Sequence, residues 1–462
     1  MFSNVAISAL AFIVALGLLI SIHEFGHFWV ARRMGVKVLR YSIGFGRTLW
    51  KRVGKVDDTE FVIAAIPLGG YVKMLDEREA DVPAADLHRS FNQKSVWARS
   101  AVIIAGPLAN ILLAIAAYWL VMMLGISGAA PLLGKVTPGS IADEAGFEFE
   151  DKLLAVNGQE TPSWADARIA LLDASLDANG PLEIEVQSND GSISTRELPV
   201  DGVNMLDAVE EDPLVKLGLR GWRPDIKPIV GFLSEGGAAE AAGFIPGDTI
   251  IKIDDTDIDS WYDMVFVIQN SANKALLIQV NRGGELLDLN VTPNGVDVDG
   301  RTVGRLGVGQ DQTTTPEFAK SMERAQVVVR YSPLIALGKA VERTWDMSVL
   351  TVRMMGKLIT GQASLKNISG PVSIAQYAGQ SVSVSFEHYI NFIALISLSI
   401  AILNLLPIPI LDGGHLLFYL FEIIRGKPLP ERVQILGHQI GLFLLGSLML
   451  LAFYNDFWRL VQ

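Results

Sequence analysis

The first 27 residues, MFSNVAISALAFIVALGLLISIHEFGH, contain the pattern on which the rest of the fold depends. Residues 1–22 carry no charged side chain, and this length is enough to cross a bilayer as a helix. The stretch leads into His23-Glu24-Phe25-Gly26-His27, an H-E-x-x-H motif. Residues i and i+4 share one helix face, so both imidazoles can bind one metal ion, with Glu24 beside them as a base. Because ionisable groups at membrane depth usually mark function, we predict a metal site here; the alternative is two histidines solvated at a helix end.

Three further stretches without charged side chains are long enough to cross a membrane: residues 100–134, 389–411 and 433–454. Over all 462 residues, 50% are hydrophobic and only 19% are charged, whereas soluble domains carry about 25% charged residues. This composition excludes a soluble, disordered or collagen-like chain. The absence of cysteine excludes disulfides and thiolate ligands, and the net charge of −12 argues against nucleic-acid binding.

The distribution of charge predicts the membrane topology. Residues 32–99 hold 13 Lys+Arg and 8 Asp+Glu, whereas residues 135–387 hold 21 Lys+Arg and 37 Asp+Glu. Since short segments rich in Lys and Arg stay in the cytoplasm, we expect four spans, with both termini and residues 135–387 outside and residues 33–95 inside. The first span lacks a basic start and a small-residue cleavage site, so we expect it to be retained rather than removed as a signal peptide.

An internal repeat with an offset of 97 residues occupies the outer region. Ala145-Gly146-Phe147 matches Ala242-Gly243-Phe244, and Trp164 matches Trp261. A glycine-rich turn, a short Ala-rich helix, Gly-Phe, and then Asp with an aliphatic strand resemble the PDZ domain. We therefore predict two α+β PDZ domains, over 134–226 and 227–314. They could capture a peptide as an added strand, or act as a passive spacer or steric filter.

Charged residues recur at helical spacing between Lys339 and Lys357, opposite an apolar face that includes Trp345. This pattern predicts an amphipathic helix within 315–387. The helix could lie on the membrane surface or against the spans, and an ordinary core helix is the alternative.

The third metal ligand has to come from a distant part of the chain, because tetrahedral zinc needs at least three protein ligands in a catalytic site. Asp412 is the only acidic residue between positions 388 and 421. It lies at predicted membrane depth, where a carboxylate needs a cation or a metal to stay ionised. Pro407 and Pro409 should interrupt the helix and let the side chain turn inward. His415 is the competing ligand.

These motifs together resemble the site-2 protease family, over essentially the whole chain. The resemblance rests on H-E-F-G-H in the first span, on N-x-x-P-x-P-x-L-D-G from Asn404 in the third, and on paired PDZ domains between spans two and three. Two shorter segments are also similar to that family: Gly44-Phe45-Gly46 to its G-x-G loop that dips into the membrane, and Gly370-Pro-Val-Ser373-Ile374 with Gly379 to its G-x-x-S-I-x-x-x-x-G segment.

The resemblance implies an intramembrane zinc metalloprotease of a bacterial inner membrane, with an active site toward the cytoplasmic side. One Zn²⁺ would be bound by His23, His27 and Asp412, and Glu24 would be general base and acid. Asn404 would hold the substrate backbone, and the Gly44–Gly46 loop would help to position it. From the residues alone, Asn404 could instead satisfy carbonyl groups that Pro407 leaves free.

The resemblance also implies single-span membrane proteins as substrates. An anti-sigma factor already shortened outside by another protease is one expected class, and leftover signal peptides are a second. The rival functions are a membrane PDZ scaffold with an inert metal site, and a zinc enzyme or metal carrier without proteolysis.

A strand-like segment, Thr59–Ile66, precedes Gly69-Gly70, which we predict to be a turn. An edge of this membrane-associated β-hairpin could hold a substrate extended; a purely structural hairpin is the alternative. The predicted organisation is a first transmembrane helix over 1–33, a loop with the β segment over 34–95, a second helix over 96–133, the two PDZ domains to 314, the amphipathic region to 387, a third transmembrane helix with L-D-G over 388–424, and a fourth over 430–456.

Overall fold

The computed structural model describes residues 2–78, 82–176, 180–200, 213–224, 226–298, 301–310, 322–365 and 368–461. The chain forms two compact units. The first is built mainly from residues up to 127 and from 328 to 456, and the second mainly from residues 128 to 327.

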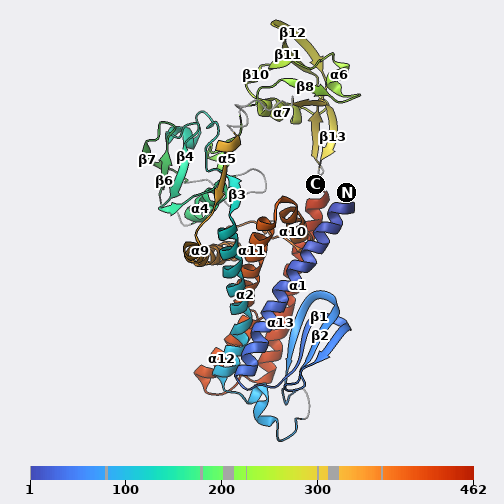
Figure 1. Cartoon of the computed structure of the whole chain (residues 1–462), viewed down its shortest axis with the longest axis vertical. Coiled ribbons are helices and arrows are strands. Elements are labelled where there is room, and N and C mark those ends of the chain that lie inside the picture. The colour runs from blue at the N-terminus through green and yellow to red at the C-terminus, as the bar shows by residue number, and fades with distance from the viewer. Residues whose placement is uncertain are drawn as a thin grey trace. The chain divides into compact units, whose positions relative to one another are not determined.

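Within the described residues, four helices of the first unit are long and apolar enough to cross a membrane: α1 (Phe2–Arg33), α2 (Val96–Leu124), α11 (Phe386–Leu405) and α13 (Glu431–Val461). Helix α2 packs against both α1 and α11 (Figure 1). Small residues allow these helices to approach closely. A Cβ atom on Gly26 of α1 would lie 2.2 Å from the Ala105 carbonyl oxygen of α2, so only glycine fits there. The predicted class, a polytopic α-helical membrane protein, is confirmed.

The third transmembrane helix was predicted over 388–424, but the structure has two helices in this range. Helix α11 ends at Leu405, and a separate helix, α12 (Asp412–Arg425), begins six residues after Leu406. The break contains Pro407 and Pro409, as predicted, because proline cannot donate a helical hydrogen bond. The connecting segment folds back over the start of α12, where a Cβ on Gly413 would lie 2.2 Å from the Leu406 carbonyl oxygen. Asp412 is therefore the first residue of a helix.

Two long strands, β1 (Val38–Val53) and β2 (Glu60–Met74), form a sheet beside α1 (Figure 1). Residues 40–43 of β1 pair with residues 60–63 of β2 and also with residues 70–73. Gly69-Gly70 are accordingly not a turn that ends the strand, and β2 instead bends while remaining extended. Gly44 and Gly46 lie within β1 rather than in a loop. Their φ angles of +91° and +83° let the strand bend, which a side chain would oppose.

The predicted substrate-holding edge over 59–66 is also wrong for its central part. Residues 60–63 pair with residues 40–43 on one side and with residues 50–53 on the other. Their backbone groups are occupied by the protein's own sheet, because the long strands fold back on themselves. Short 3₁₀ turns, η1 (Leu87–Arg89) and η2 (Phe91–Gln93), connect this sheet to α2.

Two further helices precede α11. The amphipathic segment is α9 (Pro333–Ile359), which contacts α2, and its Trp345 is exposed. Helix α10 (Pro371–Val384) contacts α1, and a Cβ on Gly379 would lie 1.9 Å from Ser8 Oγ. The Asp456 carboxylate near the end of α13 accepts hydrogen bonds from the backbone N–H groups of Gly370 and Ser373 and from the Ser373 hydroxyl. A carboxylate at this position caps the start of α10.

The second unit contains two modules with the same antiparallel strand order, β5-β4-β6-β7 and β10-β9-β11-β12. Their equivalent strands β4 and β9, and their helices α4 and α7, begin 97 residues apart. Each module has its own apolar core. The elements of the first module are α3 (Ile141–Glu144), β4 (Lys152–Val156), β5 (Gln159–Glu160), α4 (Trp164–Leu176), β6 (Leu182–Gln187) and β7 (Ile193–Leu198). Those of the second are α6 (Ala238–Ala241), β9 (Thr249–Ile253), β10 (Thr256–Asp257), α7 (Trp261–Gln269), β11 (Leu276–Arg282) and β12 (Glu285–Val291).

Smaller elements complete this part of the chain. Three two-stranded sheets pair β3 (Ile126–Ala129) with β16 (Gln326–Val329), β8 (Val230–Leu233) with β15 (Val308–Gln310), and β13 (Asn294–Val298) with β14 (Arg301–Arg305). A short helix, α5, spans Pro213–Lys216.

Candidate metal centre

His23 and His27 lie one turn apart on α1 and point to a common place. Their Nε2 atoms are 3.2 Å apart, and the rings meet edge to face. The i, i+4 spacing on a helix produces this arrangement, as the sequence predicts. His27 is 7% exposed, and His23 is partly buried, so both imidazoles are withdrawn from solvent by protein.

Asp412 brings the third donor atom. Its Oδ2 lies 3.2 Å from His23 Nε2 and 3.5 Å from His27 Nε2. Ligand atoms about 2.0–2.1 Å from zinc at a tetrahedral angle lie about 3.3 Å from one another. The three observed separations therefore fit one zinc ion. The Asp412 Oδ2 atom is also buried without a hydrogen-bond partner in the described part of the chain, as expected for an atom whose partner is a cation.

Glu24 directly follows His23 on α1, and its side chain lies against the bent strand β2. A Cβ on Gly70 would lie 3.0 Å from Glu24 Cγ and 2.8 Å from the Ser42 carbonyl oxygen, so the strand can pass this close only with glycine. The carboxylate is thus held beside the three donor atoms by the sheet, although it is not one of them.

Helix α2 packs directly on the histidines. The Val102 carbonyl oxygen lies 2.9 Å from His27 Nδ1. A Cβ on Gly106 would lie 2.2 Å from His27 Nε2 and 2.9 Å from His23 Cε1, so glycine leaves the room that the imidazoles occupy. Asn110, one turn further on, is fully buried and places its amide 3.4 Å from His23 Nδ1. None of these three residues is among the site residues predicted from the sequence.

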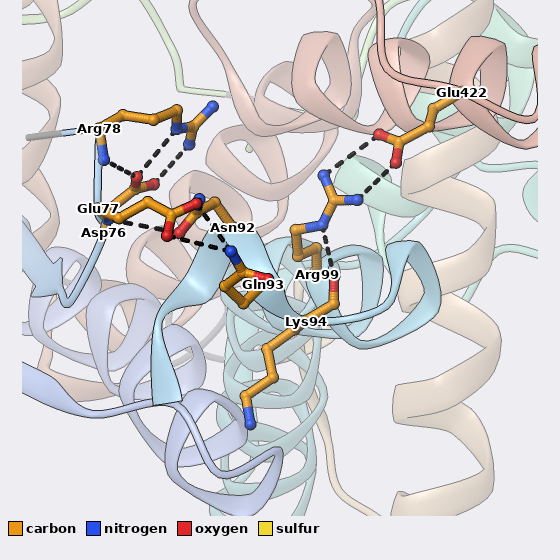
Figure 2. Close-up of polar contacts among 8 residues, drawn as sticks. All are labelled: Asp76, Glu77, Arg78, Asn92, Gln93, Lys94, Arg99 and Glu422. Carbon is orange, nitrogen blue, oxygen red and sulfur yellow. Dashed lines mark hydrogen bonds and ion pairs between the residues drawn. The ribbon is translucent and has the colours of Figure 1, made fainter. Parts of the chain in front are cut away.

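An ion pair joins α2 to α12, the helix that begins with Asp412. Figure 2 shows Arg99 with two nitrogens directed at the Glu422 carboxylate, at 2.6 and 3.2 Å, and with Nε donating to the Lys94 carbonyl oxygen at 3.1 Å. The guanidinium also lies 4.8 Å from the ring centroid of Tyr419. Both charged side chains are largely buried, so this contact restricts how α12 can move relative to α2.

Comparison with known proteins identifies the family of this chain. The model of peptidase family M50 matches residues 11–448. The chain belongs to peptidase family M50.

Curated relatives match nearly full-length. The regulator of sigma-E protease RseP of Escherichia coli is 44% identical over 97% of this chain and 98% of its own length. A Vibrio cholerae protein that carries the provisional name zinc metalloprotease is 41% identical over 98% of each chain. The regulator of sigma E protease of Haemophilus influenzae is 40% identical over 97% of this chain and 98% of its own.

The other residues singled out for this M50 peptidase lie in several places. Asn404 is half-buried in the last turn of α11, eight residues before Asp412. His415 is one turn into α12 and packs against His438 and Phe418, and it is not in the group of converging donor atoms found among the described residues. Phe45, between the two glycines of β1, stacks against Tyr71 of β2.

The G-x-x-S-I segment lies apart from the metal centre. Gly370 and Ser373 contact Asp456 of α13, Ile374 packs with apolar residues of α1, and Gly379 abuts Ser8. Ser8 precedes His23 by 15 residues, or about 22 Å along a helix at 1.5 Å per residue. In the described structure this segment therefore contributes to helix packing.

Proposed function

We propose that His23, His27 and Asp412 hold the zinc ion of an intramembrane metalloprotease and that Glu24 is its general base and acid. The observation that carries the proposal is the convergence of three donor atoms at tetrahedral spacing, with a fourth ionisable side chain beside them. His23, Glu24 and His27 lie in the C-terminal third of the apolar helix α1, and Asp412 begins α12, in a peptidase of family M50. A scaffold with an inert metal site would have no need of Glu24, and the family membership is that of an enzyme.

The chemistry divides between the metal and the protein. When bound, zinc supplies a Lewis acid that makes water nucleophilic near neutral pH. Glu24 takes the proton from the attacking water on its carboxylate and returns it to the leaving amine. Partial burial of Glu24 against Gly70 of β2 restricts the positions open to its carboxylate, which favours a productive geometry.

Access of the substrate backbone is the second requirement. A transmembrane helix hides its carbonyl groups in hydrogen bonds, so the scissile segment has to become extended before attack. We place the extended segment beside Gly70 of β2, where a Cβ atom would lie 3.0 Å from Glu24 Cγ. In this arrangement Asn404, ahead of the break between α11 and α12, binds a backbone group of the substrate, and the bend at Gly44–Gly46 shapes the hairpin.

The substrates proposed are single-span membrane proteins. Two relatives are named as regulators of sigma-E, which supports an anti-sigma factor, already shortened on the outer side, as one substrate. Leftover signal peptides are a second class. The excess of Lys and Arg over residues 32–99 supports a cytoplasmic position for the β1–β2 sheet and the catalytic end of α1 in a bacterial inner membrane.

We further propose that the two repeated modules are PDZ domains outside the membrane, acting as a size filter. The shared strand order and the 97-residue offset support a common domain type. The competing role, capture of a newly exposed C-terminus by a sheet edge, predicts the opposite effect of deleting them.

Zinc analysis of purified ligand variants tests the site directly. His23→Ala, His27→Ala and Asp412→Ala should each lose zinc and cleave a model single-span substrate poorly. Asp412→Ala is the decisive variant because its assignment depends on a distant part of the chain. Wild-type zinc content in that variant would remove Asp412 from the site.

A further inference from the structure

The residues of α2 that face the two histidines have the same four-residue spacing as the histidines themselves. Val102, Gly106 and Asn110 follow one another at intervals of four, as His23 and His27 do. The later residue of α1 meets the earlier residue of α2, with His27 against Val102 and His23 against Asn110, so the helices are antiparallel here. Gly106 lies between the two contacts and leaves room for both rings. Each imidazole thus has a polar neighbour on α2 at its Nδ1 atom.

The contact of His27 determines which of its nitrogens carries hydrogen. A backbone carbonyl can only accept, so Nδ1 of His27 must donate to Val102 across 2.9 Å. In the neutral ring, Nε2 then has a free lone pair directed at Asp412 Oδ2 and at the other histidine. This is the form of imidazole that binds a metal.

The contact of His23 requires an acceptor for the same reason. If Nε2 of His23 binds zinc, its Nδ1 carries the hydrogen and needs an oxygen opposite it. Asn110 has one, but its NH₂ group faces the ring at 3.4 Å, while its Oδ1 is buried without a hydrogen-bond partner among the described residues. Rotating the amide by half a turn exchanges the two atoms without moving the helix. Oδ1 then accepts the hydrogen of His23 Nδ1 and is no longer without a hydrogen-bond partner.

We propose that Asn110 is a positioning residue for the metal centre: its side-chain oxygen accepts the Nδ1 hydrogen of His23 and so fixes Nε2 as a zinc ligand. This inference rests on the proposed assignment of His23 as a ligand. The side chain of Asn110 supplies His23 with a hydrogen-bond acceptor, as the backbone carbonyl of Val102 does for His27. The backbone carbonyl of Asn110 is bonded elsewhere in the helical bundle. That carbonyl oxygen accepts from the Ser397 hydroxyl of α11 at 2.8 Å, which anchors this turn of α2.

The test is the zinc affinity of the full-length protein in detergent, measured by competition with a chromophoric chelator. Asn110→Leu removes the acceptor at similar volume and should weaken zinc binding about 10- to 100-fold, the range for loss of a residue that orients a metal ligand. Asn110→Asp keeps an oxygen opposite Nδ1, so this variant should bind zinc with an affinity within a few-fold of wild type. Recovery by Asp separates hydrogen bonding from packing.

Ser397→Ala is the matched control, because it removes a buried hydrogen bond to the same residue without changing the group that faces His23. It should leave zinc affinity within about twofold of wild type. Wild-type affinity in a folded Asn110→Leu protein, or a loss in Asn110→Asp equal to that in Asn110→Leu, would overturn the proposal. If Asn110→Leu does not fold, Asn110→Ala takes its place, with the same expected loss and the same contrary result.

His23→Ala distinguishes this inference from the function on which it depends. Retention of zinc by His23→Ala would contradict the ligand assignment itself. Loss of zinc in His23→Ala together with full retention in Asn110→Leu would contradict only the role of Asn110.

Discussion

Arg99 at the start of α2 and Glu422 in the last turn of α12 form a largely buried ion pair with two N–H···O contacts, of 2.6 and 3.2 Å (Figure 2). Glu422 lies 10 residues after Asp412 on α12. Arg99 lies on α2, the helix that also contacts both histidines. A contact at each end of α12 therefore sets its position in the bundle: Asp412 lies against the histidines of α1, and Glu422 is paired with Arg99 of α2.

Glu422→Ala should destabilise the protein, because it leaves the Arg99 guanidinium buried without its carboxylate. We expect a loss of about 1.5–3 kcal/mol in the free energy of unfolding, the range for hydrogen bonds to charged groups. The control is Glu342→Ala, which breaks the exposed pair with Lys339 and should cost about 0–1 kcal/mol. Denaturant unfolding in detergent measures both, and equal effects of the two changes would contradict a special role for the Arg99 pair.

Glu24→Gln should keep zinc and lose cleavage of a model single-span substrate. The change removes the proton acceptor but leaves all three donor atoms, and loss of a general base costs typically about 10²–10⁴-fold in rate. Glu342→Gln, the same chemical change at an exposed site of α9, should keep both properties. Cleavage at the wild-type rate by Glu24→Gln would rule out the proposed role.

Single cysteines test the membrane topology, since the chain has no native thiol. Ala84 and Ser194 are exposed, so a thiol at either position is accessible to a reagent on its own side of the membrane. An impermeant reagent should label Ser194→Cys in intact cells and Ala84→Cys only after permeabilisation. Labelling of Ala84→Cys in intact cells would reverse the orientation.

Deletion of the two modules separates a filter from a peptide receptor. The N–H group of Ala130 donates to the Ala325 carbonyl oxygen at 2.8 Å, so removal of residues 131–324 can be closed by a short Gly linker. A filter predicts that this variant cleaves substrate with its outer domain intact. Loss of cleavage of the shortened substrate, with no gain on the intact one, would instead indicate peptide capture.

Asp248 should make the second module sensitive to acid. Burial raises the pKa of this carboxyl, but hydrogen bonds from Arg282 and from the N–H group of Ile245 outweigh it and leave the pKa below its usual value. A lowered pKa stabilises the fold above the unfolded value of about 3.9, and that contribution is lost as pH falls through the folded value. Asp248→Asn should therefore speed hydrogen exchange in β9 and β11 at pH 7 and differ less from wild type near pH 3. An equal difference at both pH values would contradict this linkage.

The parts of the site that the sequence predicts are those set by local periodicity or by membrane chemistry. His23, Glu24 and His27 follow from helical spacing, and Asp412 from its isolation in an apolar segment next to two prolines. Asn110 was missed although it is the only asparagine between residues 100 and 134. A polar amide at membrane depth, four residues after a glycine, was the available signal.

The sheet was less predictable because its register is not local. Residues 40–43 pair with two separate parts of β2, and nothing in the strand-like run of 59–66 reveals that its central residues are covered on both sides. Gly44, Gly46 and Gly70 indicate close backbone approach in general. Which backbone approaches them depends on how the two long strands bend.

The break between α11 and α12 has a consequence for the protein without its metal. Two of the converging donor atoms belong to the uninterrupted helix α1, whereas the third opens a helix that follows an irregular segment. An ion held by all three therefore acts as a tie between elements 385 residues apart in the chain, from His27 to Asp412. By mass action, the stabilisation that the ion provides increases with the ratio of the free ion concentration to its dissociation constant. Metal supply would then govern how well this end of the helical bundle resists unfolding and other proteases, independently of any bond that this enzyme cuts.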